Sequence, residues 1–206
     1  DKLEDKEALV ELREKVENIY VNWFIDELSV KWSNAISDEL QDNWNISLIT
    51  QQNDFYNTFI KQHVIKGERV LVIRYEAAKE FSDILNTERK GFTEIYAMQG
   101  VIPSYTKLGM ASLLPNDKIE IDDKAEIIVD DINSAGTDNR EKVLLKHSEN
   151  SVAIQYKDLI EMSRSEFRKT FNGKKLIYIY YNSIDAIGDH AATEREVFNA
   201  VDETFK

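Results

Sequence analysis

The 206-residue sequence contains no cysteine, only two prolines and only seven glycines. The absence of cysteine excludes disulfide bonds and thiolate chemistry, and we expect a cytoplasmic location. Because proline and glycine interrupt regular structure, their scarcity predicts that helices and strands occupy most of the chain. No run approaches the ~20 apolar residues that a membrane span needs, and the charged first residues do not form a signal peptide. We therefore expect no association with a membrane.

Positive charge is also scarce, because 26 lysines and arginines stand against 38 aspartates and glutamates, which gives a net charge of −12. So acidic a surface repels the phosphate backbone of nucleic acids, and we expect no strong intrinsic nucleic-acid binding. The same surface tolerates cations well. The length and the apolar content of 42% suit one large globular domain, or a domain with a helical extension.

The first third of the chain has the apolar spacing of helices. Within residues 2–42, apolar side chains recur at steps of three and four, and a break is predicted at Asp42-Asn43. A further helix is predicted at 50–65. We expect both helical regions to pack through their large aromatic side chains, which are Trp23, Phe24, Trp32, Phe55 and Phe59. Residues 1–66 are therefore assigned to a helical N-terminal arm, and residues 67–206 to an α/β domain.

From Arg69 the chain alternates between strand and helix patterns. Strands are predicted at 70–73, 92–98, 152–155 and 176–181, and a small hairpin at 119–131. Helices are predicted at 75–85, 106–114, 139–146, 159–171 and 193–205. This order predicts a three-layer α/β domain with a mostly parallel sheet, preceded by the helical arm. In such a sheet, ligands bind beyond the carboxyl ends of the strands.

One junction is shorter than expected. The apolar run 70–73, expected to form a buried parallel strand, leads directly into Arg74 and the helix predicted at 75–85. Strand-to-helix connections usually take about 2–6 residues. Either the helix begins later than its pattern indicates, or residues are missing between Ile73 and Arg74.

Thr106 stands where a helix is predicted to begin, between the breaks at Pro103 and Pro115. The first N–H groups of a helix have no intrahelical partner and attract anions, of which phosphate is the most common. A threonine hydroxyl held there could attack phosphorus as a nucleophile. The simpler interpretation of the local pattern is that Ser104 or Thr106 caps the helix.

Two further polar loops could take part in chemistry. Asp185, Asp189 and His190 follow the last predicted strand, and their oxygen and nitrogen atoms suit zinc or a related divalent ion; the alternative is an ordinary polar loop. In the loop 134–141, Arg140 could clamp a phosphate or form a solvated ion pair.

The remaining polar residues of this region have simpler interpretations. Thr137 or Asp138 is expected to cap the following helix. His147 is expected on the surface at the end of that helix, and Asp130-Asp131 is expected to be solvated.

Five stretches, taken in order, resemble the PglZ family of the alkaline phosphatase superfamily, whose members occur in bacterial phage-exclusion (BREX) defence systems. The stretches are Val16 to Phe24, Arg74-Tyr75-Glu76 with Ala78, Pro103 to Ala111, Gly136-Thr137 with Asn139 to Lys142, and Tyr178-Ile179-Tyr180 with Ile184-Asp185-Ala186 and Gly188-Asp189. The stretch Pro103 to Ala111 is the most specific.

The resemblance implies metal-assisted hydrolysis of a phosphate ester. Thr106 matches the nucleophile of the superfamily, Lys107 would assist electrostatically, and Arg140 would bind substrate. Asp185 and Asp189 match acidic positions of a later family motif, and with His190 they are the expected ligands of a divalent metal, zinc in the first place and manganese or magnesium otherwise. Other phage-defence proteins are the expected partners.

The sequence also departs from the family pattern. The family carries an aspartate in a short Ser-Asp-Ala-type insert before Arg74, and this insert is absent. Tyr181 stands where the family commonly has histidine, and the family continues past residue 206 into an Asp-His-Gly-type motif that helps to hold metal. The domain is therefore expected to be incomplete at its C-terminal end. An alternative function follows, in which the site is vestigial and the aromatic N-terminal helices dock a partner of the defence complex.

Overall fold

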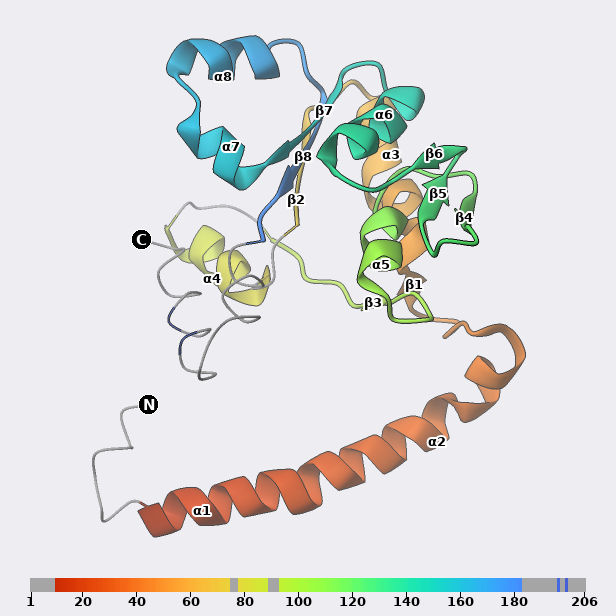
Figure 1. Cartoon of the computed structure of the whole chain (residues 1–206). Helices are drawn as coiled ribbons and strands as arrows, with labels where there is room; N and C mark the ends of the chain where they lie inside the picture. The colour runs from red at the N-terminus through yellow and green to blue at the C-terminus, as the bar shows by residue number, and fades with distance from the viewer. Residues whose placement is uncertain (1–9, 75–77, 89–92, 183–195, 197–198, 200–206) are drawn as a thin grey trace. The chain divides into compact units, whose positions relative to one another are not determined.

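The computed structural model describes residues 10–74, 78–88, 93–182, 196 and 199, and the chain divides into two compact units, residues 1–48 and 49–206 (Figure 1). The first unit is helical. It consists of α1 (Val10–Ile19), the π-helical turn η2 (Tyr20–Ile25) and α2 (Asp26–Asn43). Trp44 takes a left-handed conformation, with φ of 56°, and ends α2. The predicted helix and its break are therefore confirmed over the described residues.

The aromatic side chains of the first unit are exposed. Trp23 is 62% exposed, Phe24 45% and Trp32 52%. The expectation that these three pack in a core is therefore wrong. Phe55 and Phe59, in contrast, are partly buried against the core of the second unit, as expected.

The second unit contains all the strands among the described residues. Its elements are β1 (Thr50–Gln51), η3 (Gln52–Asp54), η4 (Tyr56–Ile60), α3 (Lys61–Ile65), β2 (Val70–Arg74), α4 (Ala78–Glu88), β3 (Met98–Gln99), α5 (Thr106–Ser112), β4 (Ile119–Ile121), β5 (Ile127–Val129), β6 (Ile132–Asn133), α6 (Thr137–His147), β7 (Ser151–Gln155), α7 (Tyr156–Glu161), α8 (Arg164–Phe171) and β8 (Leu176–Tyr180). No helix in the described part of the chain has both the length and the apolar character to cross a membrane.

A parallel three-stranded sheet in the order β2-β8-β7 is the centre of this unit. Successive side chains of β8 point to opposite faces, because a strand has a period of two. Leu176, Tyr178 and Tyr180 face one core, which receives side chains from η4, α5 and α6. Ile177 and Ile179 face a second core, which α7 and α8 cover (Figure 1). The predicted three-layer α/β arrangement is confirmed.

The edge strand β2 differs from its prediction. It is parallel to β8, but its side chains alternate between half-buried and exposed, and Leu71 and Ile73 are 53% and 41% exposed. It is therefore not a buried strand. β2 continues to Arg74, and the described part of α4 runs from Ala78 to Glu88. Residues 75–77 lie outside the described residues, so both interpretations of the short junction stay open.

Two other predicted elements differ from the structure, and a third lies almost entirely outside the described residues. Among the described residues 93–98 of the strand predicted at 92–98, only Met98 belongs to a strand, because β3 pairs with the two residues of β1 and residues 93–97 are irregular. The helix predicted at 159–171 is two helices, α7 and α8, since Ser163 begins a new helix. The helix predicted at 193–205 lies outside the described residues, apart from two isolated positions.

A small antiparallel sheet, β4-β5-β6, packs beside α5 and α6 (Figure 1). It confirms the hairpin predicted at 119–131. The turn from β5 to β6 consists of Asp130 and Asp131, whose φ angles are 49° and 68°. Two consecutive residues with positive φ are typical of the tightest hairpin turns.

Candidate functional site

Thr106 is the first residue of α5, as predicted. Tyr105 precedes it as the N-cap in an extended conformation, and no side chain caps the helix. The alternative in which Ser104 or Thr106 is the cap is therefore wrong. Thr106 is exposed, and its hydroxyl has no hydrogen-bond partner within the described residues. An exposed hydroxyl at the start of a helix is accessible to an anionic ligand.

Lys107 and Arg140, which are far apart in the sequence, line one cavity of about 140 Å³. The Lys107 Nζ atom lies 2.5 Å from the Glu126 Oε1 atom, and this hydrogen bond raises the pKa of Lys107 above its usual value. The remaining lining comes from β5 and from the loop before α6, namely Ile127, Ser134, Ala135 and Gly136. The cavity thus carries two cationic groups and one carboxylate.

The Arg140 side chain is held in place by two contacts. Its Nε atom donates to the Ser134 carbonyl oxygen at 3.1 Å, and its guanidinium carbon lies 4.8 Å from the centre of the Tyr180 ring. Tyr180 is only 3% exposed, and burial raises the pKa of Tyr180 to about 12 although the positive charge of Arg140 opposes this shift. The phenol is therefore neutral at ordinary pH, and the charged groups at this end of β8 are Arg140 and Arg74, which pairs with Tyr180 across the sheet. These contacts are not those of a solvated ion pair.

The carboxyl ends of the three parallel strands are polar. The Gln155 Nε2 atom at the end of β7 donates to the Thr137 Oγ1 atom at 2.7 Å. At the end of β2, the Arg74 Nη1 atom donates to the Asn182 Oδ1 atom at 2.8 Å. The start of α6 therefore lies at the carboxyl edge of the sheet, where ligands are expected. The N-cap of α6 is Gly136, with φ of 77°, and the prediction that Thr137 or Asp138 caps this helix is wrong.

The predicted metal ligands Asp185, Asp189 and His190 lie outside the described residues. Because Thr106 and the two aspartates all follow predicted strands, we expect them to converge at the carboxyl end of the sheet, and this stays a prediction. Tyr181, which stands where the family commonly has histidine, is half-buried, and its ring packs edge-on against Tyr156 with 4.8 Å between the ring centres. The described residues around the Lys107–Arg140 cavity include one carboxylate, Glu126, which Lys107 already binds. A metal at this edge therefore depends on residues outside the described part.

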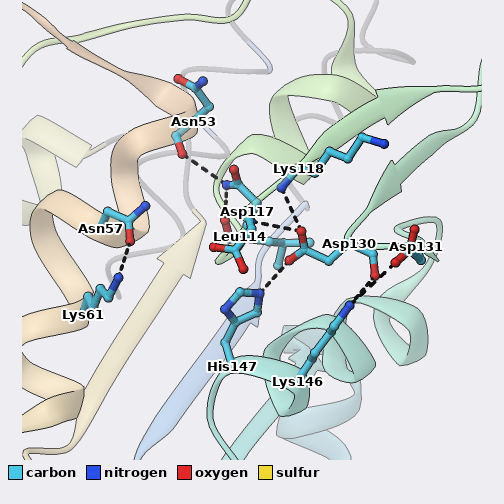
Figure 2. Close-up of polar contacts among 11 residues, drawn as sticks. Asn53, Asn57, Lys61, Leu114, Asp117, Lys118, Asp130, Asp131, Lys146 and His147 are labelled. Atoms are coloured by element: carbon cyan, nitrogen blue, oxygen red, sulfur yellow. Dashed lines mark hydrogen bonds and ion pairs between the residues drawn. The ribbon is translucent and has the colours of Figure 1, made fainter.

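Sequence reasoning missed a second polar cluster, which consists of Asp117, Asp130 and His147 (Figure 2). The ligand atoms of these three residues all lie within 4.8 Å of one another. Asp130 is 7% exposed, and the His147 Nε2 atom lies 2.6 Å from its Oδ2 atom. The expectations that Asp130 is solvated and that His147 lies on the surface are therefore wrong. The three residues belong to no short motif, and only the contacts of three separate segments bring them together.

Asp130 is the centre of this cluster. Its Oδ1 atom accepts hydrogen bonds from the backbone N–H groups of Asp117 and Lys118, at 3.0 and 2.8 Å. Burial raises the pKa of Asp130, but the hydrogen bonds from His147 and from these two backbone groups outweigh burial and leave the pKa below its usual value. The Lys146 Nζ atom donates to the Asp130 carbonyl oxygen at 2.7 Å. The carboxylate is therefore charged and fixed in orientation.

The Asp117–Asp130–His147 cluster and the Lys107–Arg140 cavity lie at opposite ends of α6. His147 follows Arg140 by seven positions in the helix, which corresponds to about 10 Å along the helix axis. His147 is close to the amino end of β7, since the Ser151 Oγ atom donates to the Ser148 carbonyl oxygen at 2.6 Å. The cluster therefore lies at the amino edge of the sheet, away from the edge where Thr106 and Arg140 were predicted to act.

Comparison with known proteins agrees with this fold. A parallel sheet between helical layers, with a polar carboxyl edge, is the arrangement of an alkaline phosphatase-like domain. Residues 55–206 match the family described as the BREX system PglZ alkaline phosphatase-like domain. The chain belongs to the PglZ family. No solved structure matches the chain.

Two curated relatives are much longer than this chain. The chain is 53% identical over 211 aligned residues to the alkaline phosphatase-like protein PglZ of Bacillus cereus strain H3081.97, and the match covers 100% of this chain and 25% of that protein. It is 35% identical over 202 residues to the alkaline phosphatase-like protein BrxZ of Escherichia coli O9:H4 strain HS, covering 93% of this chain and 23% of that protein. The chain therefore spans about a quarter of the length of these relatives.

Proposed function

We propose that this chain is part of a metal-dependent phosphoryl hydrolase, a phosphomonoesterase or phosphodiesterase, of a PglZ-type phage-defence protein, with Thr106 as its nucleophile. The observation that supports this function best is the position of Thr106. Its exposed hydroxyl begins α5 within a domain of alkaline phosphatase-like type, and the next residue, Lys107, shares a cavity with Arg140.

The proposed reaction has two displacements at phosphorus. The Thr106 Oγ atom attacks phosphorus and loses its proton, the bond to the leaving alcohol breaks, and the departing alkoxide takes up one proton. Water then attacks the phosphorylated threonine and gives up a proton, the bond from phosphorus to the Thr106 oxygen breaks, and that oxygen takes up a proton as the phosphate product is released. A divalent metal, zinc or alternatively manganese or magnesium, would be held by Asp185, Asp189 and His190 and would lower the pKa of the hydroxyl.

Lys107 and Arg140 have distinct parts in this proposal. Arg140 can offer a planar set of N–H donors to the non-reacting oxygens of a phosphate group, and its contacts with Ser134 and Tyr180 fix the direction of the guanidinium. Lys107 is a flexible cation that can exchange its bond to Glu126 for a substrate oxygen. The net charge of −12 gives no general attraction for polyanions, so recognition of phosphate depends on these local cations.

We expect the 206-residue chain alone to bind divalent metal weakly at the predicted Asp185–Asp189–His190 site and to hydrolyse phosphate esters poorly. A catalytic metal needs about three protein ligands and an open position, and this chain lacks the family aspartate before Arg74 and has tyrosine at position 181. Reinsertion of a Ser-Asp-Ala-type segment after Ile73, together with Tyr181→His and the downstream region of the longer relatives, should produce a zinc- or manganese-dependent rate.

The test is hydrolysis of aryl phosphate mono- and diesters by this extended protein, with and without a chelator. Thr106→Ala should abolish turnover, whereas Ser104→Ala, two positions earlier in the same loop, should keep it. Chelator-sensitive turnover that survives Thr106→Ala would exclude Thr106 as the nucleophile. Robust turnover by the 206-residue chain alone would show that other residues complete the metal site.

One observation supports an alternative, in which the chain is a noncatalytic interaction module of the defence complex. The first unit exposes an unusual number of large apolar side chains, among them Trp23, Phe24 and Trp32. Exposed apolar surface of this kind often marks a contact with another protein. The dependence of metal content on Asp185 and Asp189 in the extended protein distinguishes the two functions, because the interaction module needs no metal at the Thr106 site.

A further inference from the structure

We propose that Asp117, Asp130 and His147 form a structural site for a divalent cation of the zinc class, separate from the Thr106 site. The three side chains come from three segments: the loop between α5 and β4, the turn between β5 and β6, and the last residue of α6 (Figure 2). This proposal does not rest on the proposed hydrolase function. It concerns the opposite edge of the sheet and residues within the described part of the chain.

The spacing of the donor atoms is close to that of a metal site. Zinc binds carboxylate oxygen and imidazole nitrogen at about 2.0–2.2 Å, so the ligand atoms of a tetrahedral site lie about 3.3–3.6 Å apart. Here the three ligand atoms lie within 4.8 Å of one another, and the Asp130 Oδ2 and His147 Nε2 atoms are 2.6 Å apart. A side-chain shift of about 1 Å separates this last pair enough to admit the ion. The fourth position remains for water.

Asp130 has the supporting hydrogen bonds that a ligating carboxylate needs. The backbone N–H groups of Asp117 and Lys118 bind its Oδ1 atom, so that Oδ2 points at His147. Fixed outer contacts of this kind orient ligands and raise metal affinity. Asp130 is also buried at 7% exposure, whereas Asp117 is exposed and leaves the cluster open to solvent on one side.

Some charges at the end of α6 favour the binding of a cation, and one charge opposes it. The C-terminus of a helix carries partial negative charge, and His147 is the last residue of α6. Two carboxylates add to this field. Lys146 opposes it, because its ammonium group donates to the Asp130 carbonyl oxygen and lies 4.0 Å from the Asp131 carboxylate. One imidazole with two carboxylates suits zinc better than magnesium or calcium, which prefer all-oxygen sites.

The test is calorimetric titration of the 206-residue protein with ZnCl₂, in a background of Asp185→Asn, Asp189→Asn and His190→Gln that removes the predicted catalytic ligands. We expect one zinc ion per chain. Asp117→Asn should weaken the Kd by about tenfold or more, because one charged ligand is lost. Asp117 is exposed, so this variant should keep the fold, which circular dichroism checks.

Matched control variants distinguish coordination of zinc by the three ligands from a general effect of nearby charges on zinc binding. Asp131→Asn removes an acid from the same turn that is not among the three ligands, and its Kd should stay within a factor of about two. His63→Gln removes the exposed imidazole that binds Glu68 at 2.5 Å, a similar pair without a third ligand, and should also leave the Kd unchanged. Lys146→Gln should tighten binding severalfold, since it removes a like charge beside the site.

A spectroscopic measurement provides an independent readout. In the protein loaded with zinc, ¹⁵N NMR of the imidazoles should show His147 bound through Nε2, while the His63 signals stay unchanged. The proposal is overturned if Asp117→Asn and Asp131→Asn have the same Kd, or if zinc leaves the His147 signals unchanged. It is equally overturned if folded Lys146→Gln binds zinc no more tightly than the parent protein.

Discussion

At the scale of single residues, two tyrosines on one face of β8 differ in their hydrogen bonding. Tyr178 and Tyr180 are both buried, at 2% and 3% exposure. The Tyr178 hydroxyl donates to the Leu113 carbonyl oxygen at 2.9 Å, whereas the Tyr180 hydroxyl has no hydrogen-bond partner within the described residues. Burial raises the pKa of both groups, so both phenols are neutral over the ordinary pH range.

Substitution of each tyrosine by phenylalanine should therefore change the free energy of unfolding by unequal amounts. Tyr178→Phe leaves the partly buried Leu113 carbonyl group without this donor, and should lower the free energy of unfolding by about 1 kcal/mol. Tyr180→Phe removes an unbonded hydroxyl and keeps the ring under Arg140, so the change should stay below about 0.5 kcal/mol. Urea unfolding of both variants measures the difference. Equal losses would contradict the assigned hydrogen bonds.

At the scale of elements, the cap formed by Ser163 explains why the chain between Tyr156 and Phe171 forms two helices and not one. Its Oγ atom accepts a hydrogen bond from the Glu166 backbone N–H at 3.3 Å, and the Glu166 carboxylate accepts one from the Ser163 backbone N–H at 2.8 Å. This reciprocal pair is a capping box, which satisfies two N–H groups that a helix start leaves without partners. A continuous helix would lose both bonds.

Ser163→Ala should accordingly destabilise α8. Loss of a serine cap lowers the free energy of unfolding by about 1 kcal/mol. Ser165→Ala, an exposed serine two positions later in the same helix, is the matched control and should change stability little. Thermal unfolding followed by circular dichroism compares the two variants. If the two substitutions have equal effects, the capping box does not stabilise the helix.

The same cap predicts a dependence on pH. The hydrogen bonds from the Ser163 side chain and backbone lower the pKa of Glu166 below its usual value of 4.5. Because the pKa is lower in the folded state, the contribution to stability is present above about pH 4.5 and is lost as the pH falls through the folded pKa. The difference in stability between the parent protein and Glu166→Gln should therefore shrink below pH 4.5. If this difference in stability stays constant between pH 3 and pH 7, the negative charge of Glu166 does not stabilise the cap.

Local patterns in the sequence predicted elements that depend on neighbouring residues, but not features that depend on contacts between residues far apart in the chain. The helical spacing of residues 10–43 and the breaks around α5 are local properties, and both were visible in the sequence. The prediction of a strand over 92–98 was wrong for the described residues 93–97, because a strand needs a partner and, in the described part of the chain, only β1 offers one, to Met98 and Gln99. The Asp130–His147 contact spans 17 positions and depends on how β5, β6 and α6 pack, so that no local pattern indicates it.

At the scale of the whole molecule, both hydrophobic cores consist of residues from the second unit. One contains η4, α5 and α6 side chains against β8, and the other contains α7 and α8 side chains. The first unit has no buried side chain among its described residues. The buried residues that stabilise the α/β fold are therefore all found after residue 48.

A chain of residues 49–206 should then fold without the first unit. Its midpoint of thermal unfolding should match that of the 206-residue protein within a few degrees, and its near-UV circular dichroism should retain the signal of Tyr178 and Tyr180. For comparison, Leu144→Ala in the full chain removes a fully buried side chain and should cost about 2–5 kcal/mol. Failure of residues 49–206 to fold would show that the first unit supplies necessary contacts.

The place of β8 in the sheet also determines when the fold can form. β8 lies between β2 and β7, yet it is the last strand of the described chain, and Val70 pairs with Leu176 across roughly a hundred residues. During synthesis, β2 and β7 have no shared neighbour until Tyr180 has left the ribosome. Their unpaired edges are exposed for that interval, since domains fold as units once their sequence is available. Pairing of β2 and β7 in the nascent chain therefore depends on β8, and binding of a chaperone is most useful just before β8 emerges.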